Sequence, residues 1–139
     1  MIGPQREAVL RTKDDLQMKI VSLIIQIVVA LGLLNVWLLR FNRPTPYRAG
    51  NARSMAEEFA AYGLPKWLLW TVGAVKVSCA LCLVAGIWIP ALVAPAAVSI
   101  TVLMVGAIAM HLKVNDPLIK AAPASTVLAL IAVVLANAI

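Results

Sequence analysis

Four long apolar blocks dominate this sequence and decide what it can fold into. Each block holds about the 20 residues that an α-helix needs to cross a hydrocarbon layer about 30 Å thick. Together they contain only two charged residues, Lys76 and Lys120. The blocks are Ile20–Leu39, Trp67–Ile89, Ala91–Met110 and Pro117–Ile139. Because backbone polar groups inside lipid must be bonded internally, we predict an all-α fold.

Composition supports the same interpretation. Apolar residues make up 63% of the chain and charged residues 13%, against roughly 45–50% and about 25% in a soluble domain. These values exclude a soluble globular domain, a disordered tail and a disulfide-stapled secreted module. We predict a polytopic membrane four-helix bundle in residues 20–139, with spans at about 20–39, 66–89, 91–111 and 117–139. A polar tail, 1–19, precedes it.

The net charge of +6 would suggest nucleic-acid binding in a soluble protein. Here the basic residues are spread along the edges of the apolar blocks, without interleaved aromatic residues. We therefore predict contact with a lipid bilayer and none with nucleic acid. The first block exceeds the 7–15 apolar residues of a signal peptide, so we expect it to remain as an anchor.

The segment between the first two spans carries signals for a short helix. Ser54 and Glu57 have the spacing of a capping box, in which each side chain bonds the backbone amide of the other. Gly63 offers a left-handed stop, and Pro65 is suited to open the next helix. The helix itself, residues 55–62, has one apolar stripe, so we expect it to lie in the membrane interface between spans one and two.

Prolines organise the start of the last span. Asp116 is suited to cap the helix that Pro117 begins, because its carboxylate would face the positive end of the helix dipole. Pro123 removes one backbone hydrogen bond further along, so we expect it to bend the fourth helix.

Lys76 is the most informative position, since it lies near the middle of the second span. A lysine there costs about 2.5–3.5 kcal/mol on the insertion scale, and such residues usually face a cavity or a partner. The functional interpretation is an amine that lines an internal pocket. The alternative is a satisfied structural charge, held by Asn35, Gln26, Tyr62, Glu57 or Glu58.

The only two cysteines, Cys79 and Cys82, form a CxxC motif in the same span. A membrane-embedded CxxC in a four-helix bundle resembles the quinone-reactive pair of vitamin K epoxide reductases. The alternative is structural, because Ala74, Ser78, Cys82 and Ala85 form a small-residue stripe of the kind that lets helices pack closely in lipid.

His111 is the only histidine and closes the third span. One imidazole without further ligands at suitable spacing cannot build a zinc site, so we predict no metal. His111 either transfers protons at the mouth of a pocket or caps the last carbonyls of its helix. Asn35 and Gln26 lie on nearly opposite faces of the first span, where each can hydrogen-bond a neighbouring helix.

These landmarks together resemble the DoxX-like family of membrane proteins. The resemblance covers the chain from about Asn35 to its end and rests on the stretch Glu58-Phe59-Ala60-Ala61-Tyr62-Gly63-Leu64-Pro65, on Gly73, Lys76, Gly86 and Pro90, on Met104, Gly106, Ala107 and His111, and on Asp116, Pro117 and Pro123. It implies a four-helix membrane bundle. Members often carry an acidic residue where Lys76 stands, so no role of a buried carboxylate is transferred to that position.

The family resemblance implies several functions. The namesakes of the family resemble subunits of thiosulfate:quinone oxidoreductase, other members associate with redox enzymes, and animal relatives act as assembly chaperones for receptor channels. Our leading hypothesis is an accessory or partner-binding subunit of the bacterial cytoplasmic membrane, with a pocket for a small amphiphile such as a quinone. The predicted lining residues are Lys76, Tyr62, Asn35 and His111.

Two alternatives stay open at this point. One is a quinone- or thiol-linked membrane oxidoreductase whose catalytic candidates are Cys79, Cys82 and Lys76. The other is a structural assembly factor with a filled interior. The expected partner is a membrane or redox protein, with a second copy of the chain as a further alternative. The sequence leaves open whether the protein is an enzyme.

Overall fold

The computed structural model describes residues 3–139 and confirms the all-α membrane fold. In this part of the chain four helical segments are long and apolar enough to cross a membrane: Pro4–Leu39, Lys66–Ala85, Pro90–Lys113 and Leu118–Ala138. Their helices are α1 (Pro4–Leu34) with the π-helical turn η1 (Asn35–Leu39), α3 (Lys66–Ala85), α4 (Val93–Lys113) and α5 (Ala122–Ala138). The short helix α2 (Met55–Ala61) and the 3-10 turns η2 (Pro90–Leu92) and η3 (Leu118–Ala121) complete the fold.

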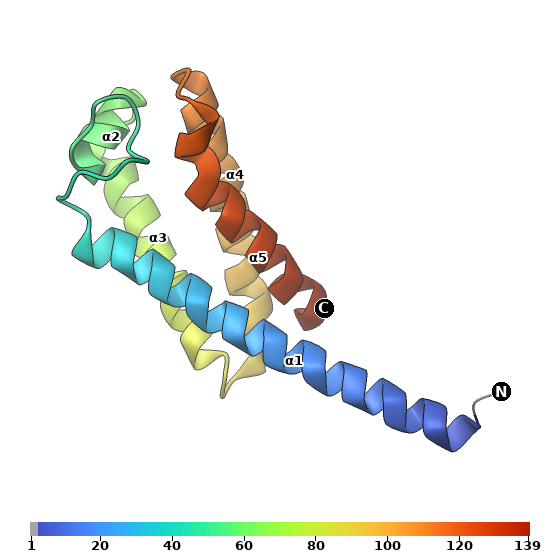
Figure 1. The fold of residues 1–139 in the computed structure, drawn as a ribbon. Coiled ribbons are helices and arrows are strands. Elements are labelled where there is room, and N and C mark those ends of the chain that lie inside the picture. The colour runs from blue at the N-terminus through green and yellow to red at the C-terminus, as the bar shows by residue number, and fades with distance from the viewer. Residues whose placement is uncertain (1–2) are drawn as a thin grey trace.

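The four long helices form a closed ring of neighbours. α1 packs on α3 and α5, and α4 packs on α3 and α5. Buried apolar side chains fill the centre, among them Val29, Leu83, Ile100 and Ile131, each at most 2% exposed. α1 crosses the other helices on a diagonal, and its first turns extend beyond them (Figure 1). The polar residues before Ile20 are thus continuous with the first membrane span, which begins as a helix at Pro4.

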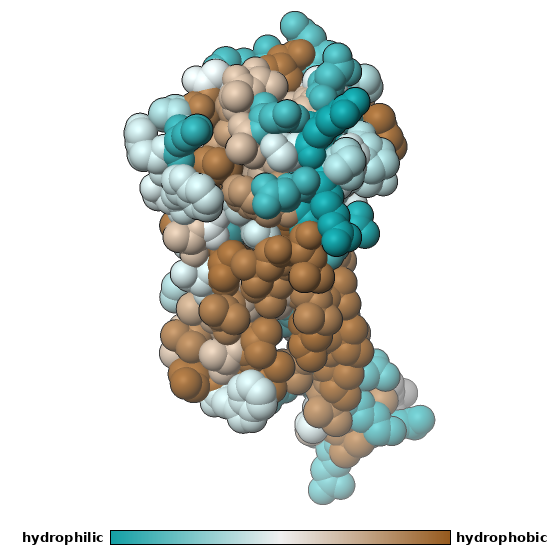
Figure 2. All heavy atoms as spheres, turned by 90° about the vertical axis from the view of Figure 1, so that its left-hand side faces the viewer, coloured by the Kyte–Doolittle hydropathy of each residue, from teal (hydrophilic) through white to brown (hydrophobic). Residues whose placement is uncertain are grey.

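A compact cap lies at one end of this ring. It consists of the loop after η1, the helix α2 and the start of α3, next to the turn that joins α4 to α5 (Figure 1). Seen from the side, polar side chains gather on the cap, and a band of apolar side chains covers the helices below it (Figure 2). We call this the cap end; the opposite end carries the α3–α4 turn and the C-terminus.

Local signals placed the cap helix correctly in most respects. The Ser54 hydroxyl accepts a hydrogen bond from the Glu57 amide at 3.1 Å, and Gly63 has the left-handed conformation with φ +76°. The reciprocal half of the capping box is wrong: the Glu57 carboxylate bonds the amide of Arg53 instead. Pro65 is extended and directly precedes α3, which begins at Lys66.

The start of the last span differs from its prediction. Asp116 does not cap a helix, because its carboxylate is engaged elsewhere in the cap. Pro117 is extended, and the 3-10 turn begins one residue later, at Leu118. Pro123 lies within the first two positions of α5. A proline at this position interrupts no internal helical hydrogen bond, so it opens α5 and does not bend it.

Candidate functional site

A buried ion pair forms the centre of the cap. Arg48, 4% exposed, donates to one oxygen of Glu58 at 2.9 Å and to the carbonyl of Arg40 at 2.5 Å. The amide of Ala49 donates to the other Glu58 oxygen at 3.2 Å. The charges are therefore paired, and backbone groups satisfy the remaining donors and acceptors, which is the condition under which a buried ion pair is tolerated.

Tyr62 connects this ion pair to α4. Its hydroxyl donates to Glu58 at 2.9 Å and lies 3.3 Å from Nε2 of His111. Burial raises the pKa of Tyr62 well above its ordinary value, and the charge of Glu58 raises it further. Tyr62 therefore remains a neutral phenol, able to donate one hydrogen bond and accept another.

His111 and Asp116 continue the chain of contacts. Nδ1 of His111 lies 2.8 Å from one carboxylate oxygen of Asp116, and the amide of Gly50 donates to the other at 3.0 Å. Burial acts to raise the pKa of Asp116. The hydrogen bonds from His111 and Gly50 and the charge of Lys120 outweigh it and hold this pKa below its ordinary value. Asp116 is thus an ionised acceptor, and Nδ1 of His111 carries a hydrogen.

Two residues with left-handed backbone conformation allow the chain to place Asp116 beside His111 and Gly50. Asn115, with φ +56°, follows the end of α4 and turns the chain so that the Asp116 amide bonds back to the carbonyl of His111 at 3.0 Å. Gly50, with φ +53°, presents its amide to Asp116 while its carbonyl accepts from Lys120 at 2.6 Å. The backbone thus brings the first loop and the α4–α5 connection into contact although about 70 residues separate them in sequence.

We call the five residues Arg48, Glu58, Tyr62, His111 and Asp116 the polar cap network. Every side-chain nitrogen and oxygen atom that is itself fully buried in the part of the chain that the structure describes has a hydrogen-bond partner. The network ties the first loop, α2, α4 and the last connection to one another. Its carboxylates, phenol and imidazole also form a continuous line of polar contacts.

Lys76 lies outside this network. It shares a face of α3 with Leu69 and Leu83, which are 2% and 0% exposed and point into the bundle. Lys76 is less deeply buried than either of them. Its ammonium sits 5.2 Å from the ring centroid of Trp37. Within residues 3–139 it makes no hydrogen bond and no ion pair, so the indole face is its one polar contact.

The π-helical turn η1 and a glycine together place that indole. Trp37, 6% exposed, leaves α1 at the wider turn and packs on Gly73 of α3. A Cβ atom at Gly73 would come within 2.8 Å of the ring. Gly73 is therefore needed for the close approach of Trp37, and π-helical turns of this kind are frequent at functional sites.

The structure divides the predicted ligand-binding set. Tyr62 and His111 meet in the polar cap network, Lys76 lies against Trp37, and the side chain of Asn35 makes no hydrogen bond within the described residues. Gln26, the other polar residue of the first span, donates to the carbonyl of Leu83 at 2.6 Å and so joins α1 to α3. His111 does not cap α4 with its ring, since both ring nitrogens face Tyr62 or Asp116.

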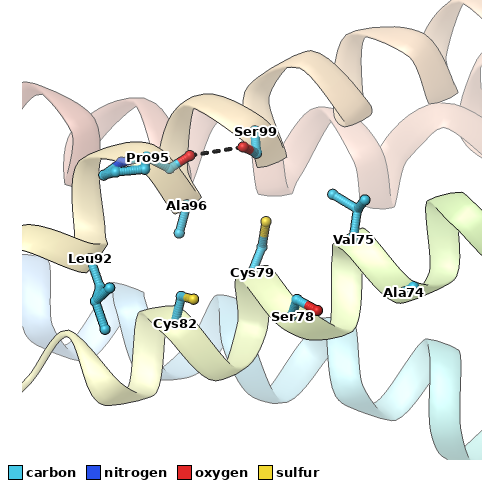
Figure 3. A pocket seen from close by; sticks show the side chains of 9 residues that line it. All are labelled: Ala74, Val75, Ser78, Cys79, Cys82, Leu92, Pro95, Ala96 and Ser99. Atoms are coloured by element: carbon cyan, nitrogen blue, oxygen red, sulfur yellow. Dashed lines mark hydrogen bonds between the residues drawn. The ribbon is translucent and has the colours of Figure 1, made fainter.

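The two cysteines line a pocket of about 350 Å³ between α3 and α4. Both thiols are free, and both point into the space between the helices, with Cys79 directed toward Ser99 (Figure 3). The lining residues are Ala74, Val75, Ser78, Cys79, Cys82, Leu92, Pro95, Ala96 and Ser99. Lys76 lines neither this pocket nor a second one of about 280 Å³ at the end of the bundle opposite the cap.

Comparison with known proteins now decides the family. A family model described as the DoxX-like family matches residues 24–135. The chain belongs to the DoxX-like family. No curated protein and no solved structure matches it. This DoxX-like protein is therefore a multi-pass membrane protein, and four of its five network residues, Glu58, Tyr62, His111 and Asp116, are among the landmarks on which the family resemblance rests.

Sequence reasoning missed Arg48, the partner of Glu58. Arg48 was grouped with the basic residues of the membrane edge, yet it is the buried cation of the network. Its signal is its place in a Pro- and Gly-rich loop just before a helix that carries two adjacent carboxylates. In residues 3–139 no three His, Cys, Asp or Glu side chains come together as metal ligands would.

Proposed function

We propose that this DoxX-like protein is an accessory membrane subunit that binds the oxygen-bearing head of a small amphiphile at Lys76. One observation carries the proposal: the ammonium of Lys76 faces the interior of the bundle and has an indole face but no oxygen acceptor within the described residues. A quinone carbonyl, a carboxylate or a phosphate would supply that acceptor.

The energetics favour a bound oxygen at this position. An ammonium at mid-membrane costs about 2.5–3.5 kcal/mol, and one cation–π contact returns about 0.5–2 kcal/mol of it. A hydrogen bond from a charged donor adds about 1.5–3 kcal/mol. The contact with Trp37 and a ligand oxygen together offset the cost, whereas Trp37 alone does not.

The predicted lining residues take different parts in this proposal. Lys76 is the anchor, while Tyr62 and His111 belong to the polar cap network on the cap side of it and so close that end of the site. Asn35 has no such support from the geometry and stays a prediction of the sequence. We propose that the molecule works in the bacterial cytoplasmic membrane, as the family resemblance implies.

We assign any chemistry on the ligand to a partner membrane or redox protein. The polar cap network has its donors and acceptors paired among themselves and with the backbone. It can therefore hold the shape of the cap, but offers no uncommitted nucleophile beside Lys76. A holding role for a partner enzyme fits this arrangement better than turnover within the chain.

The experiment compares Lys76→Met with Lys66→Met, a matched change at an exposed position of the same helix. Each purified protein is extracted, and the retained lipids and quinones are measured by mass spectrometry. We expect one class of oxygen-bearing amphiphile to fall by about tenfold in Lys76→Met only. Equal profiles in both variants and the wild type would remove the site at Lys76.

A second candidate function rests on the pocket between α3 and α4. Because Cys79 and Cys82 both line it, we propose as the alternative a thiol-linked reduction of a quinone that enters from the lipid. The two thiols would lose two protons and two electrons and form one disulfide, and the quinone would take up both to become a quinol. The disulfide would then need a partner reductant of the thiol class to restore the dithiol.

This alternative is tested by a single turnover. The reduced protein is mixed anaerobically with a short-chain ubiquinone analogue, and quinol is followed by its absorbance change. One quinol per protein and a Cys79–Cys82 disulfide in the mass spectrum would support it, with no quinol from the Cys79→Ser, Cys82→Ser double variant. Free thiols and unchanged quinone in the wild type would exclude it.

A further inference from the structure

The second pocket lies at the end of the bundle opposite the cap. It has a volume of about 280 Å³ and opens between α1, the α3–α4 turn and the last turns of α5. Its lining mixes polar and apolar side chains. The lining residues are Lys19, Ser22, Leu23, Gln26, Gly86, Ile87, Pro90, Val93, Val134, Asn137 and Ala138.

Ser22 supplies an uncommitted hydrogen-bond donor to this pocket. The hydroxyls of Thr12, Thr71, Ser99, Thr101 and Thr126 all donate to the carbonyl four residues earlier in their helices. Ser22 makes no such bond, and no other within residues 3–139, although it is only 8% exposed. Because every fully buried side-chain oxygen in residues 3–139 has a partner, the Ser22 hydroxyl is still reached from the pocket that it lines. An acceptor in the pocket would complete its hydrogen bonding.

Gln26 supplies an acceptor beside it. Its amide nitrogen is fixed by the 2.6 Å bond to the Leu83 carbonyl, and the side chain is 3% exposed. Its oxygen accepts no hydrogen bond within the described residues. The absence of a side chain at Gly86 leaves room for this amide, since a Cβ there would lie 3.2 Å from the Gln26 nitrogen and 2.5 Å from Val93.

Lys19 adds a positive charge at the rim. It is exposed and forms no ion pair in the described residues. It directly precedes the first apolar block, and Asn137 on the same pocket lies in the last turn of α5. The pocket is therefore at the depth where lipid headgroups meet the hydrocarbon. Leu23 and Val134 add apolar side chains to its lining.

We propose that this pocket binds the headgroup of a membrane phospholipid. The phosphate oxygens accept from the Lys19 ammonium and the Ser22 hydroxyl, and the Gln26 oxygen accepts from an O–H or N–H of the headgroup. The first methylenes of the acyl chains lie on Leu23 and Val134. The ligand class is thus a phosphodiester lipid whose headgroup carries a donor, such as phosphatidylglycerol or phosphatidylethanolamine. Phosphatidylcholine, which has no such donor, binds more weakly.

The test uses full-length protein in nanodiscs of phosphatidylcholine with a minor fraction of phosphatidylglycerol, and counts the lipids retained after release by native mass spectrometry. We expect the wild type to retain phosphatidylglycerol preferentially. Lys19→Gln should lower that retention about tenfold and Ser22→Ala severalfold. The controls Lys13→Gln and Ser125→Ala change exposed residues outside the pocket and should match the wild type.

Two outcomes would overturn the proposal. One is retention of phosphatidylglycerol and phosphatidylcholine in proportion to their supply, with no difference between Ser22→Ala and the wild type. The other comes from adding millimolar inorganic phosphate: if it displaces the lipid fully, the pocket recognises phosphate alone and the headgroup assignment is wrong. Ser22→Ala removes one oxygen atom, so the test does not depend on Lys19→Gln alone.

Discussion

The cap and the middle of α3 treat charge in opposite ways. At the cap, Arg48 and Glu58 are buried as a pair, with backbone groups and Tyr62 completing their hydrogen bonds. Deeper in the membrane Lys76 has only the face of Trp37. A charge that the fold needs is paired within the chain, whereas Lys76 is left without an internal partner. The difference indicates that the cap serves the architecture, and it is the basis of the proposal that Lys76 binds a ligand.

The largest expected effect comes from breaking the pair. Glu58→Leu leaves the Arg48 guanidinium buried without its carboxylate, so we expect a loss of about 3–5 kcal/mol in the free energy of unfolding. The measurement is denaturant unfolding in detergent, with Glu57→Gln as the exposed control on the same helix. The double variant Arg48→Met, Glu58→Leu should recover most of the loss. A double variant as unstable as the single one would show that the charge is not the cause.

Lys76→Met should change stability with the opposite sign. Removing a charge without an internal acceptor relieves up to about 2.5–3.5 kcal/mol in lipid. We therefore expect this variant, freed of bound amphiphile, to unfold at a higher denaturant concentration than the wild type. Lys66→Met, at the membrane edge, should leave the midpoint unchanged. A destabilised Lys76→Met protein would mean that the amine is a structural group, and the contrast with the cap would then fail.

The contact between Trp37 and α3 can be broken without touching a charge. Gly73→Ala places a Cβ within 2.8 Å of the indole, and relieving that overlap should cost about 1–3 kcal/mol of stability. Gly106→Ala is the matched control, because nothing lies within 4 Å of a Cβ there. It should be neutral or stabilise by up to about 1 kcal/mol. Unfolding of the two variants side by side separates the packing effect from helix propensity.

These effects also show why some features could be predicted from the sequence and others could not. Membrane spans follow from about 20 consecutive apolar residues, and the cap of α2 from Ser54 three residues before Glu57, because both are local properties. The polar cap network depends on contacts between Gly50 and Asp116, or Tyr62 and His111, that lie far apart in sequence. Asp116 had a plausible local role as a helix cap. The tertiary contact with His111 and Gly50 took precedence over it.

For Lys76, too, the sequence predicts the local property and not the tertiary contact. Its depth in the span follows from counting residues, and its cost follows from that depth. The absence of an internal partner depends on where Trp37, Glu58 and Tyr62 come to lie. The π-helical turn that positions Trp37 leaves no clear signal in Asn35–Leu39, so the cation–π contact is visible only in three dimensions.

The smallest effect should be a pH dependence carried by Asp116 at the edge of the cap. Burial acts to raise the pKa of Asp116 in the folded protein. The hydrogen bonds from His111 and Gly50 and the charge of Lys120 outweigh it and hold this pKa below the ordinary carboxyl value. The contribution to stability is therefore complete above the ordinary pKa of about 3.9 and is lost as the pH falls through the lower folded pKa. Acid should weaken the attachment of the first loop to the α4–α5 connection while the ring of long helices persists.

Asp116→Asn isolates this titration. The amide keeps the shape of the side chain and an oxygen for the Gly50 N–H, but it neither ionises nor attracts Lys120 as strongly. We expect the variant to be less stable than the wild type at neutral pH and nearly equal to it at the acid limit, measured as unfolding midpoints between about pH 2 and pH 7. Glu57→Gln should keep the wild-type profile. A profile for Asp116→Asn parallel to that of the wild type would assign the acid sensitivity to another carboxyl, with Glu58 and its buried partner Arg48 the next pair to test.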